Sequence, residues 1–300
     1  MVDRESAIIV DRGYRHYEGI RTGRRGAMAA IVREGYRRVL GLRRKARRKV
    51  LPWFLIVLAL LSVVILIAIT WVESRLPTTL ETADLLPRYG GYFDFISVIA
   101  LLFSAYVGPE LLIPDRTQGV LNVYFSRPLS VGDYLIAKVF AYAAIMMSFW
   151  LVPQTIFHLA LAGLSPAGFL GYLSSTTDIL WKIPLAALIF FFTHASLALL
   201  IASFLNRVGA AAGVFLAGLL GLNIVAVFFL EATEAPGTRW ATLLAIEQHP
   251  RYIRDWIFDI DSLCYIPERA GFGPGISLLV VGGLVVVSIS TLFWRYRRLT

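Results

Sequence analysis

Residues 51–72 read LPWFLIVLALLSVVILIAITWV, an apolar run without a charged side chain. A helix needs about 20 such residues to cross the hydrocarbon core of a bilayer. Hydrophobic residues make up 57% of the 300-residue chain and charged residues only 16%, whereas a soluble domain carries about 25% charged residues. The run therefore predicts a membrane-spanning helix in an integral membrane protein.

Five more apolar runs follow it along the chain. The six spans that we predict are residues 51–72, 92–113, 134–163, 179–205, 208–230 and 274–294. We expect an all-α integral membrane protein with a six-span transmembrane domain over residues 51–300.

The basic residues predict how the spans are oriented. Six spans place both termini on one side, and 15 of the 29 Lys and Arg residues lie in the first 50 positions. With the N-terminus inside, 22 basic residues fall on inner segments and 7 on outer segments, as the positive-inside rule requires. We predict a multi-pass protein of the prokaryotic cell (inner) membrane with both termini cytoplasmic.

Two segments precede the first span. Residues 1–26 are expected to form a cytoplasmic arm, either a peptide that docks on a soluble partner or a disordered tail. Residues 27–50 predict a basic, amphipathic helix on the cytoplasmic leaflet, with Ile31 on its apolar face and Arg37 and Arg38 toward the other side. Because this basic tract directly adjoins an apolar span, it favours anionic lipid over nucleic acid as its partner.

The longest outer segment covers residues 231–273. Its middle, residues 246–263, mixes apolar and charged side chains at spacings that suit a helix lying at the outer membrane interface. We therefore expect an outer amphipathic segment between spans five and six.

Small residues recur every four positions on the fifth span, at Gly209, Gly213, Ala217 and Gly221. Small side chains at this spacing let two helix backbones approach closely. Two interpretations stay open: packing within one subunit, or contact with a second copy that lines a path through the membrane.

No motif predicts catalysis or a metal site on this chain. The single cysteine, Cys264, rules out an intramolecular disulfide and a cysteine-based metal cluster, and neither a phosphate-binding loop nor a zinc helix motif occurs. His158 and His194 lie on spans three and four at depths that differ by roughly 15 Å, so we interpret them as packing residues. We expect no cofactor on this chain.

The loop between spans two and three is the most informative polar segment. Residues 112–130 read LIPDRTQGVLNVYFSRPLS. Pro114 biases the residue before it away from helix, Gly119 permits a turn, and Ser130 is placed to cap the next helix, with Asp133 in its first turn. We interpret the segment as a rigid docking surface; the alternative is an ordinary solvated loop.

Several residues of this loop follow a family pattern. An acid-Arg-x-x-Gly-x-Leu run is followed by an Arg-Pro-Leu-Ser turn and a lysine that opens the third span: Asp115, Arg116, Gly119, Leu121, Arg127, Pro128, Leu129, Ser130 and Lys138. With the six-span layout, the pattern resembles the membrane subunits of type 2 ATP-binding-cassette (ABC) exporters over most of residues 27–300. Two departures are Pro114 directly before the acid and Val120 where a threonine is usual.

The resemblance implies a permease subunit whose two copies form a translocation path. It also implies two copies of a separate ATPase, which binds ATP and Mg, and a coupling loop at residues 114–133 through which that ATPase acts. The chain itself would then hydrolyse nothing. The alternative that we keep is a structural or assembly membrane protein without transport activity.

Overall fold

The computed structural model describes residues 23–42, 45–73, 75, 89–126, 129–232, 237–260 and 265–298. Within these residues every regular element is helical, and six helices are long and apolar enough to cross a membrane. They are α2 (Val50–Glu73), α3 (Tyr89–Thr117), α5 (Val131–Leu164), α7 (Ile179–Phe204), α8 (Val208–Ala232) and α11 (Pro274–Arg297). Each of the six predicted spans falls on one of these six helices, and the crossing of the membrane itself stays a prediction. Most of the predicted arm 1–26 lies outside the described residues, as does Cys264.

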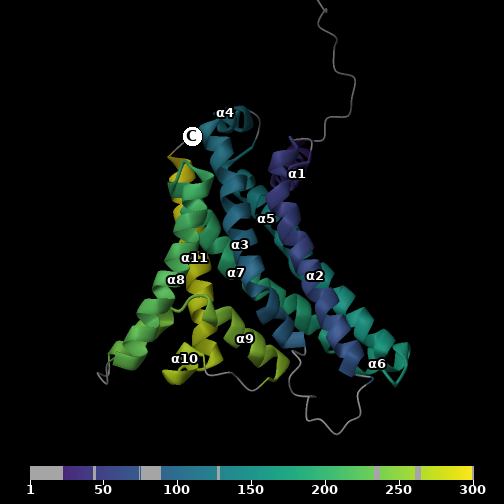
Figure 1. Ribbon diagram of the computed structural model, residues 1–300. Helices are drawn as coiled ribbons and strands as arrows, with labels where there is room; N and C mark the ends of the chain where they lie inside the picture. Colours follow the sequence, from purple (N-terminus) through teal and green to yellow (C-terminus); the bar gives the residue numbers. More distant parts are fainter. Residues whose placement is uncertain are drawn as a thin grey trace, which may run out of the picture.

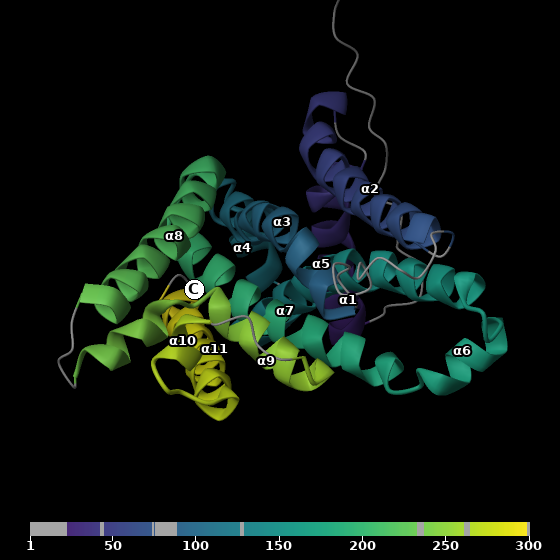
Figure 2. The same cartoon turned by 60° about the horizontal axis from the view of Figure 1, so that its bottom comes forward.

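Shorter helices lie at the two ends of the bundle. They are α1 (Gly23–Val39), the 3-10 helix η1 (Ala46–Arg48), α4 (Val120–Phe125), α6 (Phe169–Ser175), the 3-10 helix η3 (Thr238–Leu244), α9 (Gln248–Phe258) and α10 (Ile266–Arg269). Figure 1 shows α1, α4 and the C-terminus at one end, and α6, α9 and α10 at the other. Toward the second end the bundle spreads apart, with α8 diverging from α2 and α5, as Figure 2 shows with that end turned forward.

The centre of the bundle is the packing of α3 against α7. A Cβ atom at Gly108 would lie 2.6 Å from the Cβ of Ala198, so only glycine allows this close approach of the two helices. Nearer the second end, Phe93, Trp150 and Phe190 join α3, α5 and α7, with ring centroids 4.8 to 5.5 Å apart. Close backbone contact and aromatic packing thus form one continuous core.

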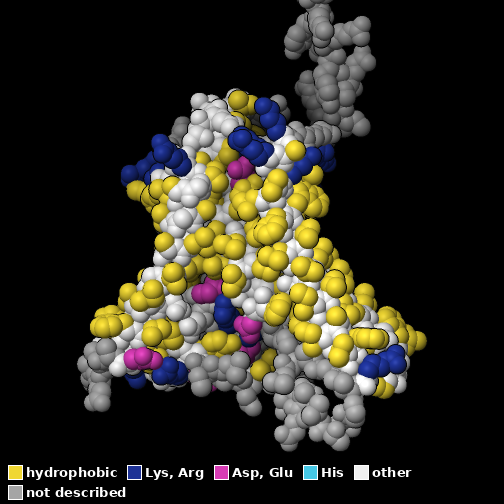
Figure 3. Space-filling view, in the orientation of Figure 1, with side chains coloured by type: hydrophobic (Ala, Val, Ile, Leu, Met, Phe, Trp, Pro, Cys, Tyr) yellow, Lys and Arg dark blue, Asp and Glu magenta, His cyan; other side chains and the backbone are white. Residues whose placement is uncertain are grey.

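The outer helices turn large apolar side chains away from this core. Val57 on α2, Leu220 on α8 and Leu279 on α11 are 59%, 65% and 71% exposed. Figure 3 shows apolar side chains over the middle of the molecule, with Lys and Arg side chains at the end that carries α1 and α4. Such extensive apolar exposure is unfavourable in water and fits a multi-pass membrane protein.

The predicted helix over residues 27–50 differs from the structure in two ways. It is divided into α1 and η1, and α1 packs against α5 and α3. At Gly35 a Cβ atom would lie 2.9 Å from Leu111 and 3.0 Å from Ala141, so the contact is tight. Arg38, which we predicted on the polar face, is only 7% exposed, because it meets a buried carboxylate described below. The position of α1 at the leaflet stays a prediction.

The predicted outer helix over residues 246–263 is shorter and more buried than expected. The structure places α9 against α7 and α11, and Arg254 and Asp255 are each only 1% exposed. A helix lying on the interface would leave these two charges in water. They are buried because each pairs with neighbouring groups, as described below.

The orientation of the bundle is testable at the ends of two spans. Because basic residues concentrate on the side of the α7–α8 turn, a fluorescent reporter fused after Arg207 should fluoresce in the cytoplasm. A periplasm-dependent phosphatase fused after Leu164, where α5 ends, should be active. Fusion of each reporter at the other site provides the control. The reverse pattern, or the same side for both sites, would contradict the predicted topology.

Candidate functional site

The carboxylate of Asp115, in the last turn of α3, is fully buried among basic and aromatic side chains. Arg38 of α1 forms an ion pair with its Oδ1 atom, and the Nζ atom of Lys138 on α5 lies 2.6 Å from Oδ2. The Tyr134 hydroxyl donates a hydrogen bond to Oδ2 at 3.0 Å. We call these four residues the Asp115 cluster. It joins α1, α3 and α5 at one point.

The charges of the Asp115 cluster stabilise one another. An isolated buried charge costs several kcal/mol, but here one carboxylate lies between two cations. Burial, the largest single effect, would lower the pKa of Arg38, but the charge of Asp115 and its hydrogen bond, with smaller contributions from Tyr124 and Glu34, together hold this pKa above its ordinary value. The ammonium group of Lys138 also lies 5.4 Å from the centre of the Tyr134 ring, within range of a cation–π interaction.

The next residue, Arg116, binds the end of α7. The last carbonyl groups of a helix have no partner within it and form the negative end of its dipole. Arg116 donates to the carbonyl oxygen of Ala202 at 2.8 Å and to those of Ser203 and Leu205. Arg295 of α11 donates to the Ser203 oxygen at 2.6 Å. We call Arg116 and Arg295 the α7 clamp, because together they fix α3 and α11 to the end of α7.

The expectation that Pro114 keeps Ile113 out of a helix is wrong, because Ile113 is helical. The helix α3 continues to Thr117, and the amide of Gln118 donates to the Pro114 carbonyl at 3.0 Å. Proline forfeits one backbone hydrogen bond inside a helix. The side chains of Asp115 and Arg116 nevertheless hold this turn against α1, α5 and α7, so the helical path is kept.

The two ends of the loop form as the sequence predicts. Gly119 has a φ angle of +69° and turns the chain from α3 into α4, a conformation that favours glycine. Ser130 caps α5 in a capping box: its Oγ accepts from the Asp133 amide at 3.2 Å, and its own amide donates to the Asp133 carboxylate at 2.9 Å. Arg24 of α1 donates to the same carboxylate at 2.8 Å.

The predicted coupling residues do not form one exposed surface. Asp115 and Lys138 are buried, which corrects the expectation that Asp115 meets charges on a soluble partner; its charge is already paired within the chain. Arg127 and Pro128 lie outside the described residues. The exposed residues of the loop include Thr117, Gln118 and Gly119 at the end of α3, and Asn122 and Val123 on α4, where Val123 is 58% exposed.

A cavity of about 370 Å³ lies beside α4. Its walls include both residues of the α7 clamp, Leu121 of α4 and the polar side chains of Asn122 and Asn206. The guanidinium groups and amides are hydrogen-bond donors, so this hollow suits an acidic or carbonyl-bearing group.

A second polar cluster, at the opposite end of the bundle, was not predicted. Arg254 of α9 lies 2.8 Å from the Asp94 carboxylate of α3 and donates to Asp255 at 2.7 Å. The Tyr265 hydroxyl donates to Asp255 at 2.7 Å, and burial raises the pKa of that carboxyl. Figure 3 shows acidic and basic side chains together in the hollow where the bundle spreads apart. The cluster ties α9 to the other end of α3.

The second cluster extends toward α7 through Glu247, whose carboxylate lies 3.1 Å from the Nε2 atom of His194. Charged residues stand every four positions at Glu247, Arg251 and Asp255. This spacing places them on one face of a helix, so the sequence could have predicted a charged face on α9. The contact with a histidine of α7 had no such signal. Among the described residues, no group of three or more His, Cys, Asp or Glu side chains is placed to hold a metal ion.

Removing the carboxylate charge of Asp115 should destabilise the bundle strongly. Asp115→Asn leaves Arg38 and Lys138 buried without a counter-charge, which we expect to cost about 3 to 5 kcal/mol. The matched control is Asp178→Asn: Asp178 is 50% exposed and lies 3.1 Å from Lys182, and an exposed pair contributes about 1 kcal/mol or less. Thermal unfolding in detergent should therefore show a much larger loss for Asp115→Asn. Equal losses would contradict the assigned role of the cluster.

No protein-family model matches the chain, and no curated protein sequence matches it. The geometry at the α4 end of the bundle is therefore the basis on which a function is proposed.

Proposed function

We propose that this chain is the membrane subunit of an ATP-driven exporter whose ATPase is a separate chain that binds ATP and Mg. The observation that carries the proposal is the way the loop around α4 is anchored. Its first end is held by the Asp115 cluster and the α7 clamp, and its second end by the Ser130 capping box. A force applied to α4 would therefore be transmitted to α1, α3, α5, α7 and α11 through the side-chain contacts of the described residues.

The docking surface in this proposal is α4 together with the cavity beside it. Asn122 and Val123 are exposed on α4, and the cavity presents donors from Arg116 and Arg295. An acidic side chain of the ATPase would complement that charge, and complementary charges at an interface raise the association rate and fix its register. In this interpretation Arg116 acts mainly as a link to α7, because its guanidinium group already binds carbonyl groups there.

The small-residue stripe of α8 supports assembly as a dimer. A Cβ atom built at Gly209, Gly213 or Gly221 meets nothing within 4 Å, and Ala217 is exposed. The interpretation as packing within one subunit therefore finds no neighbouring helix in the described part of this chain. A second copy packed on the stripe would gain the close contact that small residues allow.

Cysteine crosslinking tests the dimer. Single cysteines at the four stripe positions, in a Cys264→Ser background, should crosslink two copies in membranes because the stripe lies at their contact. Leu279→Cys on α11, where the native side chain is 71% exposed, is the control and should give no crosslink between the two copies. Crosslinks from α11 alone, or none from α8, would contradict the proposed interface.

Binding of the ATPase tests the proposed function itself. The tagged chain, purified from its own membranes, should bring with it an ABC-type ATPase that mass spectrometry identifies and that hydrolyses ATP. Val123→Asp should reduce its recovery about tenfold, which corresponds to roughly 1.4 kcal/mol, because it places a negative charge and its solvation shell in the contact. Leu170→Asp is the control, since Leu170 of α6 is 78% exposed at the opposite end.

Equal recovery of the ATPase with both variants would contradict docking at α4. If no ATPase accompanies the wild-type chain under conditions that preserve membrane complexes, the exporter proposal fails. The chain would then fit the structural or assembly role that the sequence left open.

A further inference from the structure

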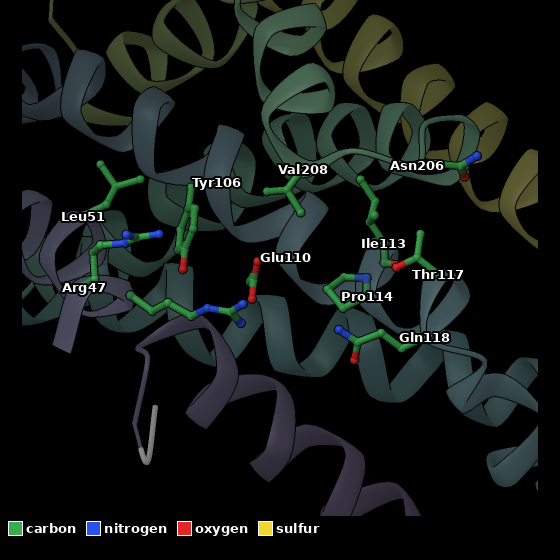
Figure 4. Close-up of a pocket in the computed structure, with 11 residues that line it drawn as sticks. Arg47, Leu51, Tyr106, Glu110, Ile113, Pro114, Thr117, Gln118, Asn206 and Val208 are labelled. Atoms are coloured by element: carbon green, nitrogen blue, oxygen red, sulfur yellow. The ribbon is translucent and has the colours of Figure 1, made fainter. Parts of the chain in front are cut away.

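A cavity of about 430 Å³ lies where α2 begins, between η1, α3 and the first residue of α8, Val208. Figure 4 shows Arg47 of η1 on one side of this space, and Glu110 of α3 and Gln118, the residue directly after α3, on another. The proposed function does not account for this cavity.

The polar walls of the cavity suit a phosphate group. Arg47 and Arg48 line it together with one acidic side chain, Glu110, so the formal charge of the lining is positive. Guanidinium groups bind phosphate oxygens through two parallel hydrogen bonds, and the amide of Gln118 adds a further donor. The cavity also adjoins the start of the 25-residue helix α8, where the helix dipole favours an anion.

The apolar wall indicates what the phosphate is attached to. Leu51, which lines the cavity, is the second residue of α2 and is 50% exposed. Phe54 and Leu61 lie on nearly the same face of α2 and are 59% and 49% exposed. An apolar strip thus runs from the cavity along the span. A ligand with a phosphate at one end and a hydrocarbon chain at the other fits both parts.

We propose that this cavity binds the phosphate headgroup of a membrane phospholipid, with its acyl chains along the exposed face of α2. The basic N-terminal tract alone predicts only diffuse attraction to an anionic surface. The cavity adds a defined position in which Arg47 and Arg48 meet the phosphate and Leu51 meets the first methylene groups.

Native mass spectrometry of the purified chain, titrated with phosphatidylglycerol, tests the site. The Arg47→Gln/Arg48→Gln double variant should bind the lipid about tenfold more weakly, as expected when charge-assisted hydrogen bonds are lost. The matched control is Lys45→Gln/Lys49→Gln, which removes the same charge from the same exposed segment, although neither lysine lines this cavity. The control should bind nearly as tightly as the wild type.

A third variant tests the shape of the cavity without changing its charge. Gln118→Trp fills part of the space without changing the net charge, and it should also weaken binding. Equal losses from the arginine and lysine pairs would show diffuse attraction and overturn the site, as would unchanged binding in the arginine variant. Displacement of the lipid by glycerol 3-phosphate would identify a soluble phosphate ligand and overturn the lipid assignment.

Discussion

The burial of the Asp115 carboxylate is the constraint on which the α4 end of the molecule depends. A carboxylate removed from water needs counter-charges, and it finds them on two other helices, in Arg38 and Lys138. Those cations are buried and need Asp115 equally. Because the three charges lie on α1, α3 and α5, separating α3 would leave two buried cations without their counter-charge in a low-dielectric interior, and separating α1 or α5 would remove one of the two cations paired with Asp115. Tyr134 completes the cluster through its hydroxyl and packs against Tyr296 of α11, with ring centroids 5.6 Å apart.

The last turn of α3 contacts helices on both sides of the bundle. Successive side chains on an α-helix point about 100° apart, since a turn holds 3.6 residues. Asp115 therefore faces α1 and α5 while Arg116 faces the end of α7, where Arg295 also binds. The same turn leads through Gly119 into α4. This arrangement places the exposed loop at the meeting point of five helices, which is why the loop, and not a span, is the candidate for receiving force.

The opposite end of α3 is held by a different set of charges. Asp94 forms an ion pair with Arg254 of α9. The same guanidinium group donates hydrogen bonds to Asp255 and to the Tyr265 hydroxyl. Between the two ends, Gly108 brings α3 against α7. The central helices are thus fixed along their length. By contrast, α8 and α11 turn most of their apolar surface outward, and the glycines of α8 face open space that a second copy is proposed to cover.

Part of this arrangement can be predicted from residues that are close together in the sequence. The six spans follow from the length of apolar runs, the turn from the conformational freedom of Gly119, and the cap from the three-residue spacing of Ser130 and Asp133; each depends on neighbours in the chain. Arg38 and Asp115 are 77 positions apart, and nothing local marks them as partners. Only the tertiary structure decided that Arg38 and Arg254 are buried and that α3 continues through Pro114. A charge enters the interior, and a proline is kept within a helix, when groups distant in sequence stabilise them there.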